Sequence, residues 1–161
     1  MHRMIVIIAA GSLYIPEYMD PKEPASLVVV LHGGTGHGAD FLWSWLREAR
    51  SRGFVVLAPT SQSDTWSLMG EDIDLGPLTA MIDFIKQQCS IDEDHILLTG
   101  MSDGGTYTLQ AGLHPDSPFT HLAPFSGVLH PEIQMMGRMQ HARDREIYLV
   151  HGTLDWMFPI E

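Results

Sequence analysis

The strongest chemical signal in the sequence is a serine enclosed by glycines, at Gly100-Met101-Ser102-Asp103-Gly104-Gly105. The apolar run at 95–99 predicts a strand before it, and the residues from about 104 to 113 predict a short helix after it. The pattern G-x-S-x-G between a strand and a helix is typical of a nucleophilic serine on a tight, strained turn, where side chains at the flanking glycines would clash. The amide of Asp103, at the helix N-terminus, would favour negative charge in the same space. A glycine-rich turn with an incidental serine is the alternative.

A second glycine-rich turn, His32-Gly33-Gly34-Thr35-Gly36, follows the continuous apolar run at 27–31. Glycine gives such a backbone the freedom to turn an N–H group toward a substrate oxygen. Turns of this kind after a strand also bind phosphates, but a Walker A loop is excluded because no Gly-Lys-Ser/Thr follows. We expect His32 itself to be structural, with its imidazole hydrogen-bonded inside the loop.

A third candidate group is Asp155, in the loop 151–159 after the apolar run at 147–150. A lone aspartate in a loop is usually a turn or cap residue. After a parallel strand and downstream of the serine, however, it stands where the acid of a catalytic triad belongs. Its role there is to hold an imidazole in one tautomer and to stabilise that imidazole when it is charged.

The order of elements places these three groups at one edge of a sheet. Apolar runs predict strands at 27–31, 54–58, 95–99, 121–125 and 147–150, and helical periodicity predicts helices at about 41–53, 78–89 and 104–113. Residues 16–24 indicate a turn between early strands, and residues 60–74 a polar loop. This alternation predicts the α/β class, with a mostly parallel sheet covered by helices on both faces. In such sheets the reactive groups lie beyond the carboxyl ends of the strands.

Together these motifs resemble the α/β-hydrolase serine esterases of the phospholipase/carboxylesterase family, including feruloyl esterases and polyhydroxybutyrate depolymerases. The resemblance runs from about Leu13 to the end of the chain. It rests on 13–16 ahead of the sheet, 31–34 as the oxyanion turn, 100–105 as the elbow and 151–155 as the acid loop.

The resemblance implies that Ser102 is the nucleophile, that Asp155 is the acid, and that the amides of Gly34 and Asp103 form the oxyanion hole. The implied reaction is hydrolysis of a carboxylic ester through an acyl-enzyme intermediate, without a metal or an organic cofactor. The sequence also contains no HExxH pattern or comparable zinc cluster.

The catalytic histidine of the family order Ser, Asp, His is not found in the expected place. All nine histidines precede Asp155, including His151 in the same loop, and the chain ends six residues after Asp155. We therefore expect a single α/β-hydrolase domain, 1–161, that is C-terminally incomplete. The strand, helices and histidine loop that it lacks would amount to roughly 50 residues. A truncated gene, or a histidine supplied by another chain, are the alternatives.

These alternatives leave other functions open. The chain could be a catalytically impaired fragment that acts as a binding or interaction module, or a peptidase of the same fold. An uncovered sheet edge would also favour a homo-oligomer.

Aromatic residues near these motifs are candidates for binding the substrate. Trp66 lies in the loop after the second central strand, and Trp156 and Phe158 flank the acid. We expect them to line a pocket for an apolar or aromatic ester. Ordinary packing is the alternative for each of them.

Composition restricts the possible partners. The formal net charge of −11 opposes binding to nucleic acid or anionic membranes and is compatible with a small neutral ester as substrate. No apolar run approaches the ~18 residues of a membrane span. We expect the start of the chain, 1–10, to form a first strand, with a signal peptide as the alternative, and we expect a cytoplasmic protein. One cysteine, Cys89, excludes an internal disulfide.

Overall fold

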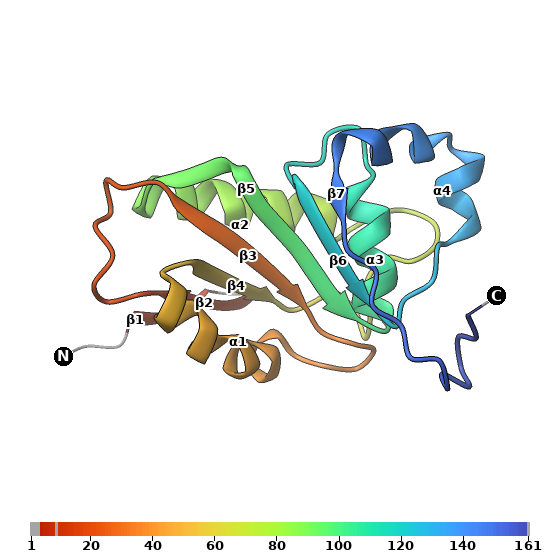
Figure 1. Ribbon diagram of the computed structural model, residues 1–161, viewed down its shortest axis with the longest axis horizontal. Coiled ribbons are helices and arrows are strands. Elements are labelled where there is room, and N and C mark those ends of the chain that lie inside the picture. Colours follow the sequence, from red (N-terminus) through yellow and green to blue (C-terminus); the bar gives the residue numbers. More distant parts are fainter. Residues whose placement is uncertain (1–3, 9, 161) are drawn as a thin grey trace.

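The computed structural model describes the backbone of residues 4–8 and all of residues 10–160. Its centre is a seven-stranded sheet in the order β1-β2-β4-β3-β5-β6-β7 (Figure 1). The strands are β1 (Met4–Ile8), β2 (Gly11–Ile15), β3 (Ala25–Leu31), β4 (Val55–Pro59), β5 (Ile91–Met101), β6 (His121–Phe125) and β7 (Glu146–Ile147). β1 and β2 pair antiparallel with their neighbours, and all other pairs are parallel. The mostly parallel sheet confirms the predicted fold class.

Helices cover both faces of this sheet, because successive side chains of a buried strand point to opposite sides. On one face, α1 (Gly38–Arg52) packs Leu42 and Ala49 against Val28 and Val30 of β3. On the other face, α2 (Leu75–Gln88) and α3 (Asp103–Gly112) pack against the alternate set of β3 residues, which begins at Ala25. The predicted end of the first helix is confirmed, since Gly53 caps α1 in the left-handed conformation with φ 78°.

The strand register brings the predicted motifs to the same edge. Leu31, the last residue of β3, pairs with Gly100 of β5, and Met101 pairs with Phe125 at the end of β6. An isolated bridge joins Phe125 to Val150, so the loop that contains Asp155 also begins beside β6. The loops after β3, β5 and β6 therefore leave the sheet side by side, as expected for carboxyl ends of parallel strands.

Some elements differ from the predictions. Residues 13–15 lie inside the sheet, as part of β2, and not ahead of it. The strand expected at 147–150 is regular only over β7, although hydrogen bonds from the Tyr148 and Val150 amides continue its pairing with β6. A short helix, α4 (Pro131–Met135), and a 3₁₀ helix, η1 (Arg138–Asp144), occupy a segment for which the sequence showed no periodicity.

The edge next to β6 exposes apolar side chains. The exposed fractions are 72 % for Tyr148 and 68 % for Leu149. The expected association of two copies at this edge stays a prediction. In the described part of the chain, no helix is long and apolar enough to span a membrane.

Candidate active site

Ser102 occupies a strained turn between β5 and α3. Its φ of 56° and ψ of −117° are rare for a residue with a side chain and are sustained by surrounding contacts. Its amide donates to the Phe125 carbonyl at 2.9 Å, and its own carbonyl accepts from the Thr106 amide at 2.9 Å. The side chain is partly exposed, and Asp103 begins α3 directly after it. The turn therefore presents the serine at the helix N-terminus, where the dipole favours an anion.

Close backbone packing explains the glycines on either side of this serine. A Cβ atom at Gly104 would lie 2.4 Å from the His32 carbonyl oxygen and 2.7 Å from that of Leu31. A Cβ atom at Gly100 would lie 2.5 Å from the carbonyl oxygen of Gly104. The predicted steric need for glycine at both positions is confirmed, and the first turn of α3 is packed directly against the end of β3.

The second glycine-rich turn touches the first. A Cβ atom on Gly33 would lie 3.7 Å from the Ser102 Cβ atom, and one on Gly34 would lie 2.7 Å from Oδ2 of Asp103. The same oxygen accepts a 2.6 Å hydrogen bond from the Thr65 hydroxyl, so the loop 60–74 also holds the residue after the serine. The structure thus brings Ser102, Asp103 and Gly34 together. Thr65 was not predicted as part of this group, because nothing in a loop sequence marks a contact with a residue 38 positions away.

His32 is fully buried, and both of its ring nitrogens are used. Nε2 accepts from the Ser61 amide at 3.0 Å, which leaves the proton on Nδ1, and Nδ1 donates to the Gly33 carbonyl at 2.6 Å. Burial lowers the pKa of His32 below its ordinary value, so that the neutral ring is favoured. The expectation of a structural histidine inside this loop is confirmed.

Trp66 lies in the core beneath the same turn, and the predicted contact with a substrate is not supported. Its side chain is 3 % exposed and stacks on Tyr107, with ring centroids 5.4 Å apart. The indole Nε1 donates to the His32 carbonyl at 2.8 Å. Trp66 therefore fixes the backbone from which the Gly33-Gly34 turn departs.

A buried carboxylate, absent from the sequence predictions, organises the loop 60–74. Asp74 is 3 % exposed, and its two oxygens accept from the amides of Gln62 and Ser67 and from the Ser67 hydroxyl. Next to it, Asp72 accepts a 2.7 Å hydrogen bond from the Tyr107 hydroxyl. The sequence does contain a signal for this role: Asp72 and Asp74 stand just before an expected helix, where acidic side chains often accept hydrogen bonds from free amides.

Asp155 lies in a tight local turn. Its Oδ1 accepts from the amides of Met157, at 3.0 Å, and Phe158, at 2.9 Å. The hydrogen bonds from Phe158 and then Met157 hold the pKa of Asp155 below its ordinary value, so the carboxyl stays ionised. Its Oδ2 lies 3.4 Å from Nε2 of His151, and that nitrogen donates to the Phe158 carbonyl at 2.6 Å. The two aromatic residues predicted to contact a substrate here are Trp156, which is 85 % exposed, and Phe158, which is half-buried. Their contact with a substrate stays a prediction.

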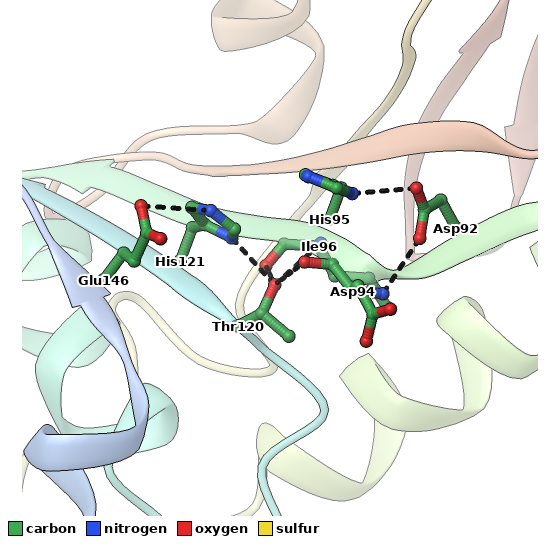
Figure 2. Close-up of polar contacts among 7 residues, drawn as sticks. All are labelled: Asp92, Asp94, His95, Ile96, Thr120, His121 and Glu146. Carbon is green, nitrogen blue, oxygen red and sulfur yellow. Dashed lines mark hydrogen bonds and ion pairs between the residues drawn. The ribbon is translucent and has the colours of Figure 1, made fainter.

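Other histidines lie at the opposite end of the strands, away from Ser102. Figure 2 shows His95, near the start of β5, stacked on His121, the first residue of β6, with ring centroids 5.7 Å apart. Each ring faces a carboxylate: Asp92 lies 2.8 Å from His95 Nδ1, and Glu146 lies 3.5 Å from His121 Nε2. Among the described residues, no imidazole forms a hydrogen bond with the Ser102 hydroxyl, and no group of three His, Cys, Asp or Glu side chains could hold a metal ion.

Known proteins of similar structure include esterases and related hydrolases. A thermostable esterase is 25 % identical, with a TM-score of 0.70 over 92 % of this chain and 44 % of its own. Poly(aspartic acid) hydrolase-1 from Sphingomonas sp. KT-1 is 16 % identical, with a TM-score of 0.73 over 94 % of this chain and 70 % of its own. The second likeness concerns the fold alone.

Sequence comparison adds a curated relative and a family. A bifunctional acetylxylan esterase/xylanase from Neocallimastix patriciarum is 31 % identical over 148 residues, which are 89 % of this chain and 21 % of that protein. The chain thus spans about a fifth of that relative and less than half of the thermostable esterase. The model of the phospholipase/carboxylesterase family matches residues 74–161, more than half of the chain, and this match includes both Ser102 and Asp155. The chain therefore belongs to the phospholipase/carboxylesterase family of α/β-hydrolases.

Proposed function

We propose that this protein is a serine hydrolase that cleaves carboxylic esters through an acyl-enzyme intermediate, with Ser102 as the nucleophile. The observation that carries the proposal is the strained, positive-φ backbone of Ser102 at the junction of β5 and α3. A strained conformation of this kind persists where the surrounding structure imposes it, and such conformations cluster at functional sites. Membership of an esterase family supports the same function.

In the proposed reaction, the Ser102 oxygen attacks the ester carbonyl carbon while a general base takes the hydroxyl proton. The carbonyl oxygen becomes an oxyanion, which the amides of Gly34 and Asp103 stabilise by hydrogen bonds. The intermediate collapses, the alcohol leaves with the proton, and water then hydrolyses the acyl-serine to release the acid. The base's imidazole would be oriented by Asp155, whose hydrogen bonds from two amides keep it ionised.

The proposal assigns none of the histidines of this chain to the base. His32 uses both ring nitrogens in its loop, and the Nε2 of His151 is engaged with the Phe158 carbonyl. The steps above need no metal and no organic cofactor. A small neutral ester suits a protein with a net charge of −11, and O-acetyl groups of a polysaccharide are the natural first substrate to test, given the acetylxylan esterase relative.

A fluorophosphonate probe and p-nitrophenyl acetate together test the proposal. We expect the probe to label the folded chain at Ser102, identified by mass spectrometry of the digested protein. We expect slow hydrolysis of the acetate ester, because the oxyanion hole and binding alone sustain residual catalysis when no base of this chain is assigned. Ser102→Ala should lose both reactions and remain folded, because a partly exposed hydroxyl buries little. Ser44→Ala is the matched control, since Ser44 is an exposed serine on α1. Labelling that persists in Ser102→Ala, or a folded wild-type chain that never reacts, would contradict the assignment.

A further inference from the structure

A hollow with a volume of about 490 Å³ lies between α1 and β2, apart from Ser102. Its floor includes Tyr14 of β2, which is 4 % exposed and donates to Glu17 at 3.0 Å. Its wall is a row of side chains on α1: Trp43, Arg47 and Arg50. These residues are four and three positions apart, so they lie on one face of the helix.

The side chains of this row are available to a ligand. Trp43 is 61 % exposed, although a large aromatic side chain is usually at least half buried. Within the described residues, neither Arg47 nor Arg50 forms an ion pair. On the same helix, by contrast, Arg52 is paired with Glu48 at 3.0 Å. The hollow therefore combines an open aromatic face with two guanidinium groups that form no ion pair with any carboxylate of the described residues.

The charge of the hollow is opposite to that of the protein. Two arginines face one carboxylate, Glu17, which leaves a formal charge of +1 in a chain whose net charge is −11. α1 also contains three of the nine Lys and Arg residues of the sequence. A local positive potential on an acidic protein attracts anions to that place alone. Guanidinium groups bind carboxylates through paired N–H···O bonds.

We propose that this hollow binds an acidic oligosaccharide. A uronate carboxylate pairs with Arg47 and Arg50, and the apolar C–H face of a sugar ring packs on the indole of Trp43. The choice of a carbohydrate among anions rests on the proposed action on polysaccharide esters, whereas the choice of an anion with an apolar face rests on the hollow itself.

The position of the hollow suits a long ligand. α1 begins at Gly38, which packs on the last residues of β4 at the edge of the sheet that also carries Ser102. Trp43 is five residues further along, a rise of about 7.5 Å, and Arg50 lies about 10 Å beyond it. A ligand that reaches both Ser102 and the hollow must therefore be extended along α1.

Direct binding measurements with a xylo-oligosaccharide that bears one glucuronic acid test this proposal. Isothermal titration calorimetry should show binding that weakens as salt is added. Arg47→Gln combined with Arg50→Gln, and separately Trp43→Ala, should raise Kd at least tenfold. Arg138→Gln and Arg143→Gln, on η1 and outside the hollow, are matched controls that should leave Kd unchanged.

Two further ligands decide which part of the ligand is recognised. A neutral xylo-oligosaccharide of equal length should bind at least tenfold more weakly, and equal binding would overturn the role of the carboxylate. Inorganic phosphate should not displace the acidic oligosaccharide at similar concentration, and full displacement would reduce the hollow to a simple anion site and overturn the proposal. Absence of binding, or binding that survives in all hollow variants, would overturn it as well.

Ester hydrolysis is measured separately in each variant, so the two proposals fail independently. Binding by a chain that never reacts at Ser102 would contradict the proposed function and leave the hollow intact. Reaction at Ser102 without oligosaccharide binding would support the proposed function and contradict the proposed role of the hollow.

Discussion

Replacement of Gly104 by alanine tests whether the elbow and the end of β3 are packed as tightly as the structure shows. The new Cβ atom would lie 2.4 Å from one backbone carbonyl oxygen and 2.7 Å from another, those of His32 and Leu31. Such contacts are well inside van der Waals distance, and both neighbours are backbone, so no rotamer change can relieve them. Overpacking of a core typically costs 1–3 kcal/mol, and we expect Gly104→Ala to lie at the upper end, about 3 kcal/mol.

Urea denaturation gives the measurement. With an m-value of roughly 2 kcal/mol/M, a loss of about 3 kcal/mol moves the midpoint down by about 1.5 M. For a chain of this size the same loss lowers Tm by roughly 6–12 °C. Fluorophosphonate labelling should fall in parallel, because α3 must move away from the Gly33-Gly34 turn.

Gly76→Ala is the matched control, since nothing lies within 4 Å of the Cβ position there. It lies in α2, where alanine should stabilise the chain by about 0.5–1 kcal/mol. If Gly104→Ala unfolds within 0.5 kcal/mol of the wild type, the close contact between α3 and β3 is wrong, and so is the steric account of the elbow.

Two further predictions concern the turn beneath the site. His32 has a lowered pKa in the folded protein, so the folded state binds fewer protons than the unfolded one below the unfolded value of about 6.5. The contribution of the neutral His32 ring to stability is present above about pH 6.5 and is lost as the pH falls toward the folded pKa. The free energy of unfolding, measured in urea at several pH values, should therefore fall less steeply toward low pH in His32→Gln than in the wild type. Parallel curves for the two proteins would refute this prediction. Trp66→Phe removes the hydrogen bond to a buried carbonyl and should cost about 1–3 kcal/mol, whereas Trp156→Phe, at an 85 % exposed position, should change the unfolding midpoint little. Equal midpoints for these two variants would show that the indole N–H contributes nothing.

The central strands were predictable because their residues are apolar on both faces. The run 27–31 and the run 54–58 leave no polar face, which is the pattern of a strand covered on both sides, and they form β3 and β4 in the structure. The glycine requirement at the elbow was also predictable, because a strand that turns at once into a helix leaves no space for side chains.

What the sequence could not predict depends on contacts between distant segments. β5 begins at Ile91, not at 95, because the polar residues 92–94 extend the strand. A shift of register lies between Ala25, which pairs with Ile91, and Leu27, which pairs with Ile96. Polarity alone made these residues resemble a loop. Trp66 is similar: a tryptophan in a polar loop can face solvent or the core, and its partners, the His32 carbonyl and the Tyr107 ring, are 34 and 41 positions away. For Ser102, Gly34 and Asp155, the structure gives positions, and their chemical roles stay predictions.

The anchoring of the loop 60–74 gives the surroundings of Ser102 one fixed wall. Trp66 in the core, the buried Asp74 and the Thr65 bond to Asp103 mean that this loop cannot swing away without exposing apolar surface and breaking buried hydrogen bonds. Opening on this side thus has the high free energy of core unfolding. If Ser102 is the nucleophile, an ester too bulky for this wall is therefore rejected, because the loop does not move to accommodate it.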